Sequence, residues 1–233
     1  MTWKEIFTSS IGRKFVMGLT GLFLILFLIV HVAVNAMIFA VWFGDDGMIF
    51  NEAAHFMGSN VLVRTMEIGL FAGFLLHIIQ GLILEFDNRT KRKTGYAIPL
   101  GNRGSRWYSR WMGLLGTLIL LFLVIHLWHF WVPARVTGHE ELTSIAIGSS
   151  QGHDMFNLMK HQFQVPWVVI VYVLACISLA YHLLHGFQSA FRTFGLRNQR
   201  WLKIVQGLGV AFSLIVPLVF AMMPISMYLG WIQ

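Results

Sequence analysis

Six histidines of this 233-residue chain lie inside long apolar stretches, where ionisable side chains are costly and usually functional. They are His31, His77, His126, His129, His182 and His185. Neutral imidazole is a common protein ligand of haem iron, and a six-coordinate iron takes one axial ligand on each face of the macrocycle. Because the chain has a single cysteine and no C-x-x-C-H motif, a haem here would be held without a covalent link. The histidines therefore predict b-type haem binding.

The apolar stretches themselves predict five membrane-spanning helices, because a span needs roughly 20 apolar residues. The expected ranges are 14–40, 61–86, 109–132, 166–191 and 203–230. The composition agrees: 57% of the residues are hydrophobic and only 12% are charged, which excludes a disordered chain or an ordinary soluble domain. The sequence thus predicts an all-α integral membrane protein with one transmembrane domain over residues 1–233. We expect four helices to form a haem-binding bundle, and Pro217 and Pro224 to bend the fifth.

Basic residues gather on one side of the predicted membrane domain. Most of the 17 lysines and arginines lie near the N-terminus, in the connection 89–110 or in the connection 192–203. The positive-inside rule then predicts a cytoplasmic N-terminus and an external C-terminus, with the loops near 41–60 and 133–165 facing outward. Binding of nucleic acid is disfavoured despite the net charge of +7, because the basic residues alternate with apolar spans instead of forming one solvated face.

A short internal repeat relates the first helix to the third and the second to the fourth. The segment GLFLILFLIVH ends at His31 and GTLILLFLVIH ends at His126, while H-x-x-[QH]-G begins at His77 and again at His182. At 1.5 Å per residue, the first two histidines lie roughly 25 Å from the cytoplasmic edge and the other two roughly 14 Å from it. The pattern predicts an outer haem between His31 and His126 and an inner haem between His77 and His182.

Glycines near these ligands have two interpretations that the sequence leaves open. Gly69, Gly73 and Gly81 share one helix face with His77. Their missing side chains would admit a flat macrocycle, or would simply allow close helix packing. His129 and His185 have no counterpart in the first repeat, and we interpret them as structural, or at most as neighbours of a quinone.

Charged residues at the helix ends are candidate partners of the haems and of a quinone. Those placed at expected inner ends, where they suit haem propionates or lipid headgroups, are Arg13, Arg110 and Arg192. On the outer side, Glu52 and Glu67 are candidate acceptors for a quinol proton. Arg64, three residues before Glu67, predicts an i,i+3 ion pair as an equal alternative for that carboxylate.

Five short motifs, in their order and spacing, resemble one known family. They are FLIVHVAVN around His31, NEAAHFM from Asn51, HIIQG from His77, VIHLW around His126 and YHLLHGF around His182. The family is the membrane cytochrome b subunit of succinate:quinone oxidoreductase and quinol:fumarate reductase, of the single-chain, five-helix, two-haem type. The likeness extends over the first four helices and the first outer loop.

The resemblance implies two haem b groups with the same ligand pairing, and a membrane quinone, commonly menaquinone, as substrate. It implies flavoprotein and iron–sulfur partner subunits on the cytoplasmic face of a bacterial inner membrane. It leaves open whether the complex forms a dimer or a trimer. Glu52 is the nearest match to the family's outer quinone-site carboxylate. Ala180 stands where some fumarate-reducing members have a glutamate, which favours succinate oxidation or a different proton route.

Three alternatives differ in partners or chemistry. A di-haem anchor of a hydrogenase or formate dehydrogenase would share the ligands but carry other subunits. A haem-free transporter would use the buried histidines for protons. A respiratory cytochrome b is less compatible, because it needs two ligands about 13 or 14 residues apart on each of two helices, and no helix here has such a pair.

Overall fold

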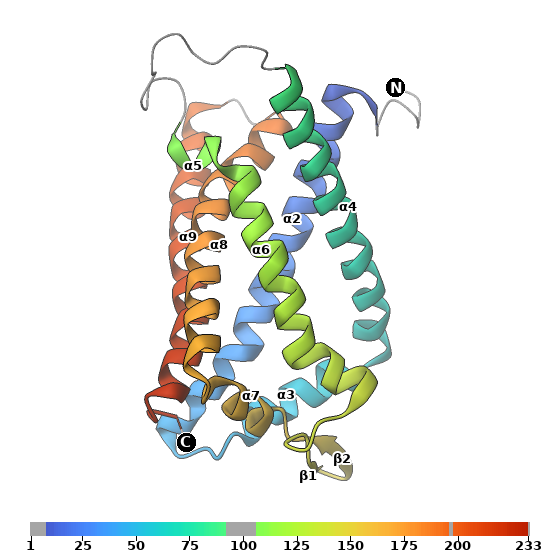
Figure 1. The fold of residues 1–233 in the computed structure, drawn as a ribbon, viewed down its shortest axis with the longest axis vertical. Coiled ribbons are helices and arrows are strands. Elements are labelled where there is room, and N and C mark those ends of the chain that lie inside the picture. The colour runs from blue at the N-terminus through green and yellow to red at the C-terminus, as the bar shows by residue number, and fades with distance from the viewer. Residues whose placement is uncertain (1–7, 92–105, 196–197, 233) are drawn as a thin grey trace. The chain divides into compact units, whose positions relative to one another are not determined.

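The computed structural model describes residues 8–91, 106–195 and 198–232, and long helices dominate it (Figure 1). They are α2 (Ser10–Asn35), α4 (Val61–Lys91), α6 (Met112–His126), α8 (Pro166–Thr193) and α9 (Gln199–Tyr228). A 3-10 helix, η1 (Ala36–Phe43), continues α2, and two π-helical segments, η2 (Leu127–Trp131) and η3 (Pro133–Thr137), continue α6. Within the described residues, five helices are long and apolar enough to cross a membrane. The prediction of a multi-pass, all-α membrane protein is confirmed to that extent.

The helix bounds agree with the predicted ranges to within a few residues at most ends. The largest differences are at the C-terminal ends of α2, α4 and α6, and after α2 and α6 the chain continues as η1 and η2. α2 already begins at Ser10, and α4 continues through charged residues to Lys91. α9 remains one helix through Pro217 and Pro224, which a membrane helix tolerates although each proline removes a backbone donor.

Short elements occupy the two segments that the sequence analysis treated as outer loops. They are α3 (Met48–Ser59), α7 (Met155–Phe163) and a hairpin of β1 (Ser144–Ile147) and β2 (Ser150–His153). The strands pair antiparallel with Ser144 opposite His153, and Gly148 supplies the positive φ of 57° at the turn. A further short helix, α5 (Trp107–Arg110), precedes α6. The basic residues Arg92, Lys93 and Arg103 of the second connection lie outside the described residues.

The chain divides into two compact units, each built from parts of several helices. Unit 1 comprises residues 1–27, 70–119 and 178–214, and unit 2 comprises residues 28–69, 120–177 and 215–233. The expectation of a single transmembrane domain stays a prediction. His77 and His182 belong to unit 1, whereas His31 and His126 belong to unit 2. Each predicted histidine pair therefore falls inside one unit.

Unit 1 is held together by close helix packing and by one ion pair between helices. The guanidinium of Arg13 on α2 donates to the Asp87 carboxylate on α4 over 2.6 Å. A Cβ at Gly209 on α9 would lie 2.7 Å from the Phe187 ring on α8, so the absent side chain lets these helices approach closely. Small residues at helix contacts are the usual packing device of membrane bundles.

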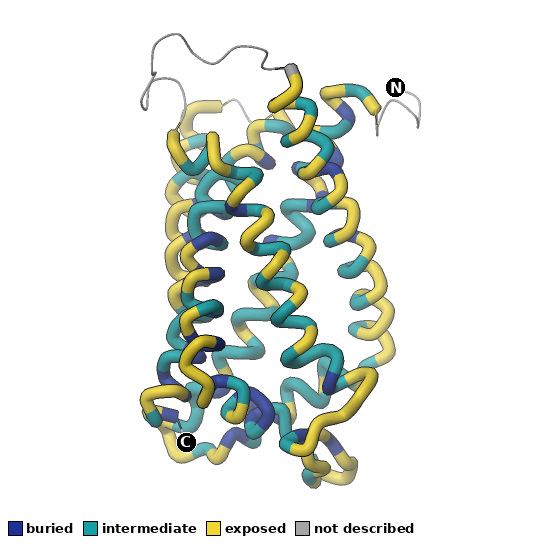
Figure 2. Tube along the Cα trace, viewed as in Figure 1, coloured by how far each residue is buried: buried dark blue, intermediate teal, exposed yellow. Residues whose placement is uncertain are grey.

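Unit 2 has a core of buried side chains contributed by η1, α3, α7, α8, α9 and the segment that follows α9. Its most deeply buried members include Ile38, Phe50, Phe163, Val168 and Ile232. The hairpin and α7 both pack against α3 (Figure 1). Buried residues are dense along α7, in contrast to the exposed outer faces of the long helices (Figure 2). Exposed apolar faces are what a lipid-facing helix presents.

Asn51 is the polar link between α3 and α7, and it is 3% exposed. Its amide nitrogen donates to the Asp154 carboxylate over 2.9 Å, and its amide oxygen accepts from the Phe156 backbone N–H over 2.9 Å. Asp154 also caps α7 by accepting from the backbone N–H of Asn157. One side chain therefore anchors α3 to the first turn of α7.

We expect Asn51→Asp to destabilise the protein by about 2 kcal/mol, because it removes a buried donor and places two carboxylates in contact. The measurement is the thermal unfolding midpoint in detergent. The matched control is the exchange of both residues, Asn51→Asp with Asp154→Asn, which restores an amide opposite a carboxylate and should recover much of the loss. Equal midpoints for the single variant and the unchanged protein would contradict this account.

Candidate functional site

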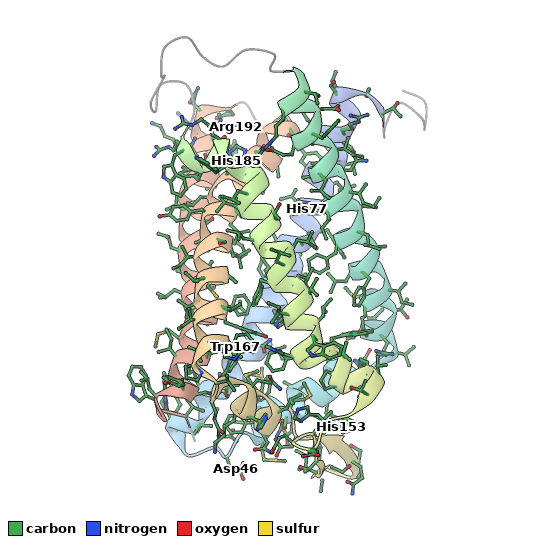
Figure 3. The ribbon with its side chains drawn as sticks, in the orientation of Figure 1. Asp46, His77, His153, Trp167, His185 and Arg192 are labelled. Carbon is green, nitrogen blue, oxygen red and sulfur yellow. The ribbon has the colours of Figure 1, made fainter. Side chains whose placement is uncertain are left out.

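In unit 1, the predicted inner pair is brought together from two helices. His77 on α4 and His182 on α8 have ring centroids 6.2 Å apart and ring planes at 64°. Figure 3 labels His77 among the helices of this unit. Residues more than 100 positions apart in the sequence are thus neighbours, as the repeat predicted.

In unit 2, the predicted outer pair shows the same arrangement. His31 on α2 and His126 on α6 have ring centroids 5.8 Å apart and ring planes at 88°. The Phe122 ring lies next to His126 at 5.6 Å, and Phe220 lies 5.4 Å from His31. Aromatic side chains therefore surround this pair.

The ring separations fit one metal ion between each pair of imidazoles. With metal–nitrogen bonds of roughly 2 Å, two axial imidazoles have ring centroids about 6 Å apart. Each ring plane need only contain the axis through the metal, so crossed planes are compatible with this arrangement. Among the described residues there is no cluster of three or more His, Cys, Asp or Glu side chains that could hold a metal ion. Each pair offers two imidazoles, a donor set that suits a macrocycle that supplies the other ligands itself.

Buried polar atoms without partners cluster at the same places. Within the part of the chain that the structure describes, no hydrogen bond reaches Nδ1 of His126, Nδ1 of His182 or Oε1 of Gln80. Gln80 is 5% exposed and lies one turn after His77. Since buried polar groups are normally satisfied, these atoms are compatible with a site that is completed by a ligand.

Two glycines of the repeat lie directly beside the inner pair. A Cβ at Gly21 on α2 would lie 3.6 Å from Cε1 of His77, and one at Gly116 on α6 would lie 3.7 Å from Cε1 of His182. These are the first residues of GLFLILFLIVH and GTLILLFLVIH. The repeat therefore carries a histidine of the outer pair at its end and a neighbour of the inner pair at its start.

Of the three glycines on the His77 face of α4, one lies in a tight helix contact. A Cβ at Gly73 would lie 2.9 Å from the Phe23 ring on α2, and one at Gly81 would lie 3.8 Å from Cε of Met17. A Cβ at Gly69 would have no heavy atom within 4 Å among the described residues. For Gly73 the structure favours helix packing over access for a macrocycle.

The two other membrane histidines occupy different surroundings. Nδ1 of His129 hydrogen-bonds with the Tyr172 hydroxyl over 3.1 Å, and the two rings are nearly parallel. Tyr172 also lies 6.1 Å from His126 between ring centroids, so His129 is a second neighbour of the outer pair. His185 lies on α8 in unit 1, toward the end that carries Arg192 (Figure 3).

Of the three arginines predicted at haem propionates, Arg13 has a protein partner. It forms the ion pair with Asp87. Arg110 ends α5 and Arg192 lies in the last turn of α8, and both are exposed. Binding of haem propionates stays a prediction for both. For Arg13, it would require the guanidinium to bind a propionate in addition to Asp87.

Glu67 and Glu52 have different environments in unit 2. Glu67 accepts from the Arg64 guanidinium over 2.6 Å and from the Trp131 indole N–H over 2.6 Å, and Arg135 lies 3.7 Å away. The i,i+3 ion pair offered as an alternative is therefore formed. Glu52 is exposed on α3. A quinol-facing role stays a prediction for both carboxylates.

Sequence reasoning missed several residues that touch the four histidines. Thr20 on α2 approaches Nδ1 of His77, and Asn35 on α2 approaches Nδ1 of His31. Asn35 had a readable signal, because it follows His31 by four residues and so lies on the same helix face. Thr20 had none, because its contact with α4 depends on how the two helices cross.

Comparison of the chain with protein-family models, with curated proteins and with solved structures gives no match in any of the three. The function must therefore be argued from the two histidine pairs and the residues around them.

Proposed function

We propose that this protein is a di-haem b electron-transfer subunit in a membrane, with an inner site at His77 and His182 and an outer site at His31 and His126. The observation that carries the proposal is the spacing of the two pairs. Each brings imidazoles from two different helices to the separation that one shared metal ion requires. A duplicated site explains two histidine pairs of nearly the same ring separation more simply than chance does.

In this proposal the chain supplies the ligands, their orientation and an apolar environment. When bound, haem b would carry one electron at a time. The paired helices hold the two imidazoles of each pair next to each other, and the glycines at 21 and 116 would leave room beside the proposed inner ligands. Phe122, Phe130 and Tyr172 exclude water around His126.

The proposed partners follow from what the chain lacks and from its charge. The sequence has no nucleotide-binding motif, so a soluble substrate would be oxidised by other subunits. The side of the protein that carries most of the lysines and arginines would face the cytoplasm and bind these other subunits. We propose the flavoprotein and iron–sulfur subunits of succinate:quinone oxidoreductase, supported by the five motifs that resemble the anchor of that complex.

A membrane quinone, proposed as menaquinone, would exchange electrons and protons on the outer side. Glu67 is the better-positioned carboxylate, because Trp131 and two arginines gather around it. A carboxylate between two arginines serves mainly in ion pairs. To accept a proton from a quinol, Glu67 would have to exchange its contact with Arg64 for one with the quinol. Glu52 remains the proposed alternative.

The first test is a reduced-minus-oxidised absorption spectrum of the purified protein, with haem measured per chain. We expect two b-type haems per chain, reduced by succinate when the whole complex is isolated. One haem per chain would contradict the repeat argument, and no haem in a folded protein would overturn the proposed function. Reduction by formate or hydrogen, with other subunits co-purifying, would keep the site and change the partner.

A further inference from the structure

The Thr20 hydroxyl lies between a carbonyl oxygen of its own helix and a histidine of another helix. Oγ1 of Thr20 lies 2.8 Å from the Val16 carbonyl oxygen, one turn earlier on α2, and 3.1 Å from Nδ1 of His77 on α4. A hydroxyl has one hydrogen to donate and lone pairs with which to accept. Because the carbonyl oxygen only accepts and is the nearer of the two atoms, we assign the hydroxyl hydrogen to Val16, which leaves the hydroxyl oxygen to accept from Nδ1–H of His77.

This contact determines the tautomer of His77. A neutral imidazole carries one hydrogen, and if Nδ1 donates to Thr20, the hydrogen is on Nδ1. Nε2 then has a free lone pair, which is the form that ligates iron. Thr20 is 8% exposed, so water does not readily replace it as the acceptor.

The other member of the inner pair has no such contact, and the repeat shows why. Gly21 and Gly116 are equivalent repeat positions, so Leu115 is the counterpart of Thr20. Leu115 is buried like Thr20, but it has no hydroxyl. Within the described residues, Nδ1 of His182 has no hydrogen-bond partner. One helix pair thus holds its ligand through a hydrogen bond, and its duplicate does not.

We propose that Thr20 is a positioning residue for the inner haem ligand: its hydroxyl oxygen accepts from Nδ1 of His77 and so presents Nε2 to the iron. The inference rests on the proposed function and adds a residue to it. An acceptor on Nδ1–H also makes the imidazole a stronger donor to the metal, which favours ferric iron and lowers the midpoint potential.

The outer pair does not share this arrangement. Nδ2 of Asn35 lies 3.3 Å from Nδ1 of His31 and donates to the His31 carbonyl oxygen over 2.8 Å. An amide nitrogen donates, so it cannot accept from Nδ1–H as Thr20 does. The contact of Asn35 with His31 is therefore of the opposite kind, and the outer haem serves as an internal reference.

The experiment is a redox titration of both haems in the intact protein, with three variants. Thr20→Val keeps the shape and removes the hydroxyl, Thr20→Ser restores a hydroxyl, and Leu115→Thr adds one at the equivalent position near His182. We expect Thr20→Val to raise the midpoint potential of the inner haem by about 59 mV, a tenfold shift for a one-electron couple. Thr20→Ser should match the unchanged protein, Leu115→Thr should lower the inner potential, and the outer potential should not move.

The outcomes separate this inference from the proposed function. An unchanged protein without haem overturns the proposed function. Two haems with an inner potential that Thr20→Val leaves unchanged overturn the role of Thr20 alone. Loss of the inner haem in Thr20→Val supports the role only if Thr20→Ser keeps it, because a merely structural threonine would not be rescued through its hydroxyl. If Thr20→Val does not fold, an inner potential that Leu115→Thr leaves unchanged or raises overturns the proposal.

Discussion

Replacing His77 or His182 with alanine is expected to remove the inner haem and to leave the outer one, so that haem per chain falls from two to one. Replacing His31 or His126 should remove the outer haem and leave the inner one. The physical reason is that each iron would lose one of its two axial ligands, while the other pair belongs to a different unit of the chain. Haem quantification and the reduced-minus-oxidised spectrum give the measurement.

Two histidines serve as matched controls. His185 lies three residues after His182 on α8, and His129 lies three residues after His126. Their alanine variants carry the same chemical change in nearly the same part of the helix, and should keep both haems. Equal loss of both haems in a ligand variant, at normal protein levels, would contradict the pairing.

Gly47→Ala is expected to destabilise the α3–α7 part of unit 2 by about 3 kcal/mol or more, through two effects. Gly47 has a φ of +92°, which an L side chain rarely adopts, and a Cβ there would lie 2.5 Å from Cγ of Phe156. Phe156 is 7% exposed within the core cluster, so its ring has little room to move. The thermal unfolding midpoint in detergent is the measurement.

Gly44→Ala isolates the backbone effect. Gly44 has a φ of +93°, and an added Cβ would meet no heavy atom within 4 Å among the described residues. In this variant the free energy of unfolding should fall by about 1 kcal/mol, from the strained backbone conformation alone. If both variants lose equal stability, the contact with Phe156 contributes nothing, and the described packing of α3 against α7 is contradicted.

The helices and the candidate ligands were predictable because lipid imposes strict rules on sequence. Without water to satisfy backbone groups, a spanning segment must be a helix of a certain length, so five apolar runs predicted five helices. A histidine inside such a run stands out against its surroundings, and the repeat in the sequence relates His31 to His126 and His77 to His182.

The outer segments were poorly predicted for the opposite reason. Between spans the chain meets water, and many backbone arrangements are then acceptable. The hairpin at 144–153 has a polar, glycine-containing sequence with little alternation, and α3 and α7 are stabilised by their contact with one another. Asn51 gives no sign in the sequence that it will bond to a residue 103 positions away.

The sequence by itself determined how many helices are long and apolar enough to cross a membrane, and which histidines were candidate ligands, because apolar length and the presence of an ionisable residue are properties of each segment alone. Only the tertiary structure decided what those residues meet. It placed Arg13 against Asp87 and surrounded Glu67 with an arginine and an indole. It also placed Thr20 next to His77, a contact that the sequence does not predict. These contacts depend on the rotation and crossing of helices, which the summed packing of many side chains sets and no single motif encodes.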